Sequence, residues 1–469
     1  MLPQLKRMTV FGFLSLLFAA ACQPVAHDLK PDELAELNKP GTVMVQATHK
    51  AEIAVPDYQL DKTKFNALLK DTLRKVDRGI IDSPAQALAS MVQEIYNQPL
   101  QYLQPSDELI QKDVEATSQG SGFIVSDKGY VVTNAHVVSS EGEALKRNLA
   151  NDALKEIAVA NCKREMNTFS EEQRSMLAQT IGTDEVINLC LEGSLTYYAN
   201  YLRIGEIDTN IKTLVGAAEV SKQGYTSDIK AMGKPTPGKD VAILKIDADN
   251  LPTVALGTTD SIGTGDATYI LGYPAAATID NSKPIEPSFT SGLISGQKLM
   301  PDGWKVLQTD AAISPGNSGG PVFNKEGKVV GVATFGSVDP ETGTQVQGIN
   351  FVVPVNIVQE FLDQSNVEPE MGRLAKVYEE GMMLRSQEKY RAALKKFQEV
   401  EDLNADYPYV KQQISEIRQA LVDNPESNLP MLASMGVGGL SVGGGIYWLT
   451  RRLRKSRTQP NVVTHSQIN

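Results

Sequence analysis

Residues 239–354 are built from short apolar runs that alternate with Gly, Pro and Asp-Gly turns. Short runs bounded by turn residues predict strands, and strands that recur at such close intervals predict an antiparallel barrel. No other part of the 469-residue chain restricts the fold as much. The length allows two or three domains, so other units are expected beside this barrel.

Two stretches before this region also predict strands. Residues 41–55 are rich in β-branched side chains and indicate one or two strands. The run "GSGFIVSDKGYVVTNAHVV" alternates strand and turn, with a hairpin expected at Asp127-Lys128-Gly129. Helical segments are expected to interrupt these strands at about 62–112 and 139–237. Within the second segment, the stretch from "DEVINLCLEG" through "SDIKAMG" is expected to return the chain to short strands.

Residues 356–423 predict helices from their apolar periodicity. Five residues here resemble one tetratricopeptide-type repeat followed by a capping helix: Gly381, Tyr390, Ala393, Phe397 and Pro408. Because three repeats are usually needed for a free-standing groove, packing on the preceding domain is as reasonable an expectation as peptide binding.

Both ends of the chain carry export and membrane signals. Residues 1–21 have the basic start, apolar middle and small final residues of a signal peptide, and the "AAAC" that follows resembles a lipobox in which Cys22 would be lipidated. Residues 429–450 are uncharged and long enough for a transmembrane helix, although their glycines also suit a mobile tail or a sorting segment. The basic tail 451–469 would stay cytoplasmic and place the rest of the chain outside the cytoplasm.

The remaining composition excludes several classes of function. A net charge of −11 argues against a nucleic-acid-binding protein. The histidines and cysteines show no metal-ligand spacing, and no phosphate-binding loop is present, so no cofactor is expected. Cys162 and Cys190 could form a disulfide in an exported protein or remain two buried thiols.

Ser318 lies in the glycine-rich stretch "DAAISPGNSGGPVFN" and is a candidate nucleophile. A serine needs a base, and only four histidines are available. His27 and His465 lie near the chain ends, and His49 lies in an early strand where a surface or structural role is expected. His136 follows an apolar strand at the start of a turn and is therefore the candidate base.

Two further features support this choice. Asp240 stands at the mouth of the strand "VAILKI", where a carboxylate could accept the Nδ1 proton of a histidine. Gly316 would let the backbone turn so that its own amide and that of Ser318 face one oxyanion.

The motifs "TNAHVV", "DVAILKI" and "TDAAISPGNSGGPVFN", in this order, resemble the trypsin-like serine peptidases of the HtrA type. This resemblance implies a mainly β, chymotrypsin-like fold of two antiparallel barrels over residues 41–354, interrupted by the helical insertions. It also implies that His136, Asp240 and Ser318 form a catalytic triad. The oxyanion hole would consist of Gly316, Asn317 and Ser318.

The same resemblance implies a binding site for substrate. Ala312 falls at the floor of the specificity pocket, Ile313 adds an apolar side chain, and Gly336 and Gly348 leave the walls open. The segment Thr334, Phe335 and Gly336 would pair with a substrate strand. Since no acidic residue stands at the floor, we expect cleavage after small or medium aliphatic residues.

The chain also departs from the family pattern. Nothing after Pro354 resembles the usual PDZ domain, and about a hundred residues separate His136 from Asp240 instead of a few tens. This extra segment would lie at the rim of the cleft. It could restrict which substrates enter, mediate assembly, or be an insertion without a separate function. The function expected is an extracytoplasmic, membrane-anchored serine endopeptidase acting on proteins or peptides, with homo-oligomers possible. The alternative is an inactive scaffold that works through its repeat-like helices.

Overall fold

The structure is a computed structural model that describes residues 29–216, 224–277, 285–339, 342 and 344–423. The expected signal peptide, Cys22, the expected span 429–450 and the basic tail all lie outside the described residues. Among the helices of the described ranges, none is long and apolar enough to cross a membrane.

A closed barrel is present, but it covers only residues 267–354 of the expected 239–354, because the strand at 242–246 belongs to the preceding sheet. Its strand order is β10-β13-β12-β11-β8-β9, and neighbouring strands are antiparallel. Aliphatic side chains such as Ile270, Leu307 and Val352 fill its interior. The strands are β8 (Ala267–Gly272), β9 (Ser288–Leu299), β10 (Lys305–Thr309), β11 (Pro321–Phe323), β12 (Val329–Val338) and β13 (Gln345–Pro354), with one-turn 3₁₀ helices at Thr259–Ser261 and Ala275–Ala277.

The preceding strands form a seven-stranded sheet in the order β2-β3-β7-β6-β5-β1-β4. An additional pairing of β1 with β2 closes all of these strands except β4 into a second ring. One hydrophobic cluster, which includes Phe123, Ile243 and Phe323, joins the two barrels. The strands are β1 (Thr42–Leu60), β2 (Leu103–Ser126), β3 (Tyr130–Thr133), β4 (Arg203–Ile204), β5 (Asp208–Val215), β6 (Tyr225–Met232) and β7 (Ala242–Ile246).

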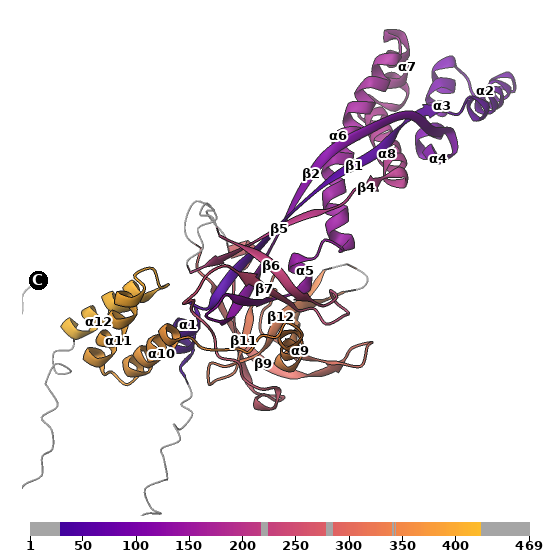
Figure 1. The fold of residues 1–469 in the computed structure, drawn as a ribbon. Coiled ribbons are helices and arrows are strands. Elements are labelled where there is room, and N and C mark those ends of the chain that lie inside the picture. The colour runs from indigo at the N-terminus through magenta and orange to yellow at the C-terminus, as the bar shows by residue number, and fades with distance from the viewer. Residues whose placement is uncertain (1–28, 217–223, 278–284, 340–341, 343, 424–469) are drawn as a thin grey trace, which may run out of the picture.

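The long strands β1 and β2 continue beyond the barrel as a two-stranded ribbon (Figure 1). The expectation of helix up to residue 112 was therefore wrong for its last part, because Leu103 opens β2 and pairs with Leu60 of β1. The sequence "LQPSDELIQK" has little β-propensity, but pairing with β1 satisfies its backbone on one side, which local propensity cannot foresee.

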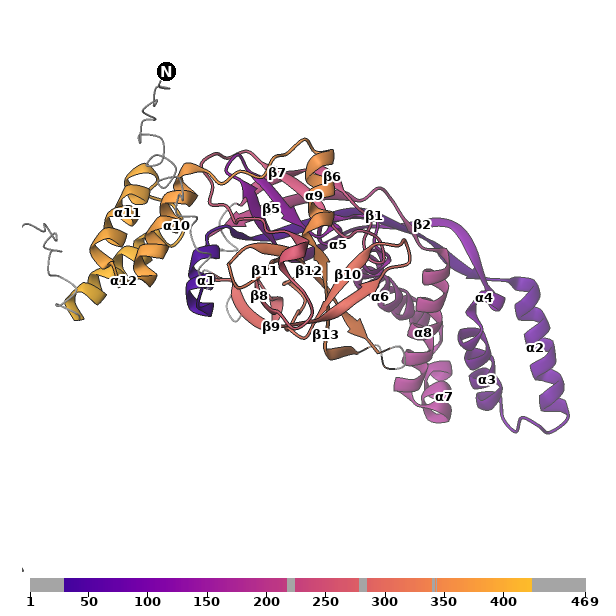
Figure 2. The same cartoon turned by 90° about the horizontal axis from the view of Figure 1, so that it is seen from below.

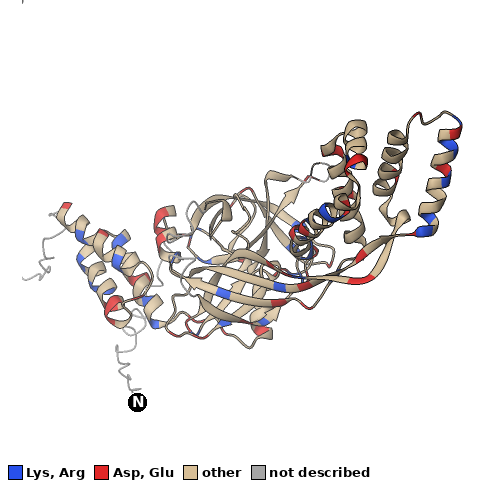
Figure 3. Cartoon of the chain, turned by 90° about the horizontal axis from the view of Figure 1, so that it is seen from above, with Lys and Arg blue, Asp and Glu red and all other residues tan. Residues whose placement is uncertain are grey.

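Helices gather along this ribbon and form an extension that projects from the barrels (Figures 1 and 2). Between β1 and β2 lie α2 (Lys62–Asp77), α3 (Pro84–Asn97) and α4 (Pro99–Tyr102). After His136 follow α6 (Glu143–Thr168), α7 (Glu171–Ile181) and α8 (Thr183–Tyr201). Lys and Arg residues are spread along α2, which lies at the end of the extension (Figures 1 and 3).

The strands expected from "DEVINLCLEG" through "SDIKAMG" occur only in the later part of this stretch, as β5 and β6, because the residues of "DEVINLCLEG" belong to α8. Val186, Leu189, Cys190 and Tyr197 are buried at helical spacing, and this periodicity outweighs the β-branched and aromatic composition. The expected helical insertion 139–237 thus ends at Tyr201, and β5 and β6 belong to the first barrel. Cys162 of α6 and Cys190 of α8 form a disulfide with an S–S distance of 2.13 Å.

The remaining helices cover the barrels and one end of the molecule. α9 (Val355–Gln364) buries Phe361 and Leu362 in the core shared by both barrels. α1 (Pro31–Asn38) lies between that core and a separate unit of α10 (Arg373–Ser386), α11 (Tyr390–Leu403) and α12 (Val410–Asp423). In this unit Gly381 lies directly against the ring of Phe397. The resemblance to a tetratricopeptide-type repeat stays a prediction.

Candidate active site

His136 and Asp240 meet at the edge of the first barrel. His136 lies on the one-turn helix α5 (Ala135–Val138) after β3, and Asp240 lies just before β7, which pairs with β3. The Nδ1 atom of His136 is 2.6 Å from Oδ2 of Asp240, and the backbone N–H of His136 donates to Oδ1 at 2.9 Å. Two contacts with one carboxylate fix both the imidazole ring and the backbone that carries it.

Asp240 is fully buried and has additional partners. The hydroxyl of Thr334 on β12 donates to its Oδ2 atom at 2.7 Å. The side-chain amide of Asn134 donates to its backbone carbonyl at 2.6 Å. The carboxylate contacts of His136 and Thr334 come from both barrels and satisfy a buried group that would otherwise be costly to desolvate.

Ser318 lies in the turn between β10 and β11. Its hydroxyl donates to the carbonyl of Thr334 at 2.9 Å, and among the hydrogen bonds of the described residues none joins Ser318 to His136. Thr334 is therefore the residue between them, since its carbonyl holds Ser318 and its hydroxyl holds the carboxylate partner of His136. In this state the Ser318 hydroxyl points its proton at the backbone.

Gly316 adopts a φ of +100°, a region that favours glycine. A Cβ atom at this position would collide with the carbonyl of Tyr273 and lie 2.6 Å from the amide nitrogen of Ala275. Within the described chain, the amides of Gly316 and Ser318 donate to no protein acceptor. Two free amides one residue apart, beside a serine hydroxyl, are suited to accept a negative oxygen. Asn317 between them is buried.

Ser121 of β2 holds this turn against the first barrel. Its hydroxyl donates to the carbonyl of Gly316 at 2.6 Å and accepts from the backbone N–H of Tyr273 at 2.8 Å. Its own N–H donates to the carbonyl of Ser318 at 2.7 Å. The glycines of "GSGFIV" were interpreted as a flexible entry to a strand, but no pattern in the sequence pointed to a role for Ser121 between them.

The residues expected to bind substrate differ in accessibility. Ala312 is exposed, whereas Ile313 is only 5% exposed and packs in the interior of the second barrel, which does not favour direct contact with substrate. Phe335 is half-buried and stacks on Phe351 with ring centroids 4.8 Å apart. Gly348 is exposed in open space.

Gln345 was missed by the sequence analysis. A Cβ atom at Gly336 would collide with the side-chain amide of Gln345. That amide donates to the carbonyl of Ile313 at 2.9 Å, so it bridges β13 to the segment before Ser318. The side chain of Gln345 thus fills the space that glycine leaves at position 336.

His49 is also buried, which is consistent with a structural role. Its Nδ1 atom is 2.9 Å from the hydroxyl of Thr209, and its Nε2 atom is 3.3 Å from the hydroxyl of Ser118. Ser118 donates to the carbonyl of Val137 at 2.7 Å, next to His136. Burial lowers the pKa of His49 below its usual value.

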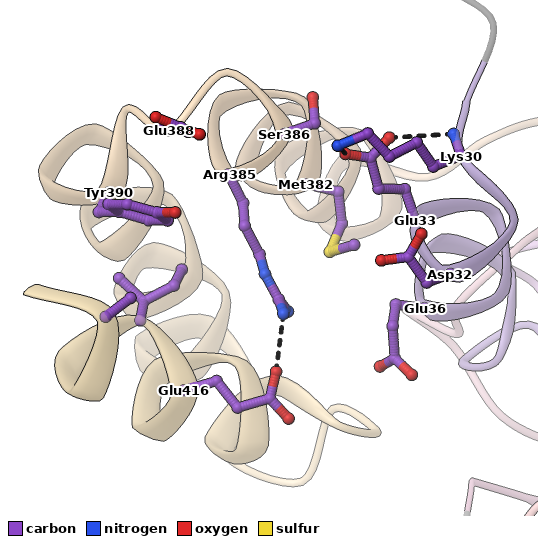
Figure 4. A pocket seen from close by; sticks show the side chains of 12 residues that line it. Lys30, Asp32, Glu33, Glu36, Met382, Arg385, Ser386, Glu388, Tyr390 and Glu416 are labelled. Atoms are coloured by element: carbon purple, nitrogen blue, oxygen red, sulfur yellow. Dashed lines mark hydrogen bonds and ion pairs between the residues drawn. The ribbon is translucent and has the colours of Figure 1, made fainter. Parts of the chain in front are cut away.

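A separate hollow lies between α1 and the C-terminal helices (Figure 4). Its wall carries more carboxylates than cations, but several of these groups already form pairs. Arg385 binds Glu416 at 2.9 Å, and Glu33 lies 3.8 Å from Lys30. No group of three or more His, Cys, Asp or Glu side chains that could hold a metal occurs in the described ranges.

Comparison with known proteins identifies the fold that carries these residues. The family model of the trypsin-like peptidase domain matches residues 120–332, which include His136, Asp240 and Ser318. Residues 120–332 therefore form a trypsin-like peptidase domain. The resemblance noted in the sequence is thereby confirmed for this domain.

Similar proteins include two named "Probable periplasmic serine endoprotease DegP-like". The protein from Pseudomonas putida strain F1 is 28% identical over 341 residues, which cover 70% of this chain and 52% of the relative. The protein from Halomonas elongata is 29% identical over 253 residues, or 53% of this chain and 35% of the relative. The chain thus spans about half or less of the length of these relatives.

A solved structure titled "HtrA-type protease AlgW with decapeptide" is also similar to this chain. The two chains are 18% identical, and the superposition covers 72% of this chain and 68% of the solved one, with a TM-score of 0.36. The assignment of the peptidase domain rests on the sequence comparisons, not on this overlap.

Proposed function

We propose that the chain is an extracytoplasmic serine endopeptidase in which His136, Asp240 and Ser318 act as a triad. The observation that carries this proposal is the 2.6 Å contact between His136 Nδ1 and Asp240 Oδ2, in a domain where a serine lies beside two free amides. The names of the relatives support the class of reaction and a location outside the cytoplasm.

The proposed chemistry begins with a rotation of the Ser318 hydroxyl away from Thr334. The oxygen then attacks the carbonyl carbon of a substrate peptide bond while Nε2 of His136 takes the proton. The amides of Gly316 and Ser318 stabilise the oxyanion, and Asp240 stabilises the imidazolium. When the peptide C–N bond breaks, His136 returns the proton to the leaving amine. Water, deprotonated by His136, then hydrolyses the acyl-enzyme and regenerates Ser318.

We also propose that the enzyme cleaves after small or medium aliphatic residues. Exposed Ala312 offers no charge to a basic side chain, and Gln345 narrows the wall beside Gly336. The segment Thr334, Phe335 and Gly336 would pair with the substrate backbone as an added strand. A peptide library in which Lys or Arg is preferred at the cleavage position would contradict this specificity.

The wider organisation is part of the same proposal. A cleaved signal peptide at 1–21, or a lipid on Cys22, would accompany export, and residues 429–450 would anchor the chain with 451–469 in the cytoplasm. The peptidase domain would occupy 41–354 and the helical unit 356–423. Homo-oligomers would follow the family pattern.

The decisive experiment is labelling with a fluorophosphonate probe, which reacts only with an activated serine. We expect the wild-type protein to be labelled and the Ser318→Ala variant to remain unlabelled, with circular dichroism showing that both are folded. A folded wild-type protein that resists the probe would instead favour an inactive scaffold.

A further inference from the structure

The helical extension encloses a cavity of about 390 Å³ that lies outside the peptidase site. Its wall is formed by the ends of β1 and β2 together with α2, α3, α6 and α7. Most lining side chains are aliphatic or aromatic, among them Phe65, Met91, Val92 and Phe169. A largely apolar cavity of this size is typical of a binding site for a small ligand or for a few side chains of a larger one.

Among the described residues that form the cavity wall, Glu165 of α6 is the only Asp, Glu, Lys or Arg. No described residue donates a hydrogen bond to its carboxylate or forms an ion pair with it, since the neighbouring Arg164 binds Asp57 at 2.7 Å instead. Burial raises the pKa of Glu165 above its usual value. An unpaired carboxylate among apolar side chains gains most from a ligand that brings a positive charge.

The apolar surface continues from the cavity along α2. Phe65 lines the cavity, and Leu69 and Leu73 follow on the same face of the helix at intervals of four residues. Leu69 is 37% exposed and Leu73 is 54% exposed, so the described part of the chain does not cover this face. A ligand with several apolar side chains in succession would cover both the cavity and this stripe.

We propose that this cavity binds an apolar polypeptide segment that carries one lysine or arginine, whose charged group pairs with Glu165. The apolar side chains of the segment would fill the space between Phe65 and Phe169 and cover the stripe on α2. An anionic lipid surface would suit the basic residues of α2, but its headgroups would be repelled by Glu165. This inference does not depend on catalysis, because the cavity shares no residue with the peptidase site.

The test uses the full chain with Ser318→Ala, so that no peptide is hydrolysed. A fluorescein-labelled peptide, Ala-Leu-Phe-Lys-Leu-Ala, is compared with versions in which Lys is replaced by norleucine or by Glu, and binding is followed by fluorescence anisotropy. We expect the Lys peptide to bind about tenfold more tightly than the norleucine peptide, with the Glu peptide weakest.

Three variants separate this cavity from the peptidase cleft. Glu165→Gln should weaken binding of the Lys peptide about tenfold and leave the norleucine peptide unchanged. Phe65→Ser should weaken both peptides, and Glu171→Gln, an exposed control outside the cavity, should weaken neither. Equal affinities for the three peptides, no effect of Glu165→Gln, or binding only to phosphatidylglycerol vesicles would overturn the proposal.

Discussion

His136 and Asp240 are 104 residues apart in the chain, yet Nδ1 of the histidine lies 2.6 Å from the carboxylate. Pairing of β3 with β7 brings them together, and the whole helical segment α6–α8 lies between them in sequence. The insertion can therefore be large without moving the two side chains, because both are attached to adjacent barrel strands.

Asp240→Asn should reduce peptidase turnover by about 10⁴-fold, because an amide facing Nδ1 favours the wrong tautomer of His136. Turnover of a fluorogenic peptide checks this, together with the rate of labelling by the fluorophosphonate probe. Asp247→Asn, an exposed residue at the other end of β7, is the matched control and should retain full activity. Equal loss in both variants would point to unfolding and not to chemistry.

Thr334→Val should lower activity by about 10- to 100-fold, since it removes a buried hydrogen bond to an ionised carboxylate worth about 1.5–3 kcal/mol. Thr334→Ser keeps the hydroxyl and should restore most of the rate. The expected effect is on kcat more than on KM, because the Thr334 hydroxyl contacts Asp240, whereas a substrate strand would pair with the backbone of this segment. A serine variant as impaired as the valine variant would argue against this role of the hydroxyl.

His49 should make the protein less stable in mild acid. Burial lowers the pKa of His49, so below about pH 6.5 its imidazole is protonated in the unfolded state but still neutral in the folded state. The free energy of unfolding should therefore fall as the pH drops from 6.5 to the lower folded-state pKa, and should be unaffected by this group above that window. Urea unfolding at several pH values checks this.

The His49→Gln variant provides the comparison for this pH dependence, because glutamine does not titrate. The difference in stability between wild type and variant should shrink or reverse as the pH falls below 6.5. If that difference is constant from pH 5 to pH 8, His49 does not titrate differently in the two states.

Cys162→Ser or Cys190→Ser should destabilise the helical extension by roughly 3–4 kcal/mol, the loop-closure value for a separation of 28 residues. Labelling of Ser318 should persist, because α6 and α8 pack in clusters separate from the barrel cores. Dithiothreitol should have the same effect on the wild-type protein and none on the variants. A variant that melts like the oxidised wild type would show that the bond contributes little.

Local patterns in the sequence were enough to predict a barrel within residues 239–354 and the type and order of the candidate reactive residues. Turn chemistry and the alternation of short apolar runs are local properties, as are the glycines around Ser318. The candidate base followed from elimination, since His136 alone among the four histidines has a suitable context.

Long-range packing sets the start of β2, the helix at residues 183–201 and the groups that hold the site together. Leu103 becomes a strand residue because Leu60 is available to pair with it. Ser121, Gln345 and the hydroxyl of Thr334 act through partners far away in sequence. In the sequence Glu165 resembles any residue on a helix surface, and only the packing of α2, α3 and α7 places it in the wall of a cavity. Such contacts depend on long-range packing, which no local pattern of residues encodes.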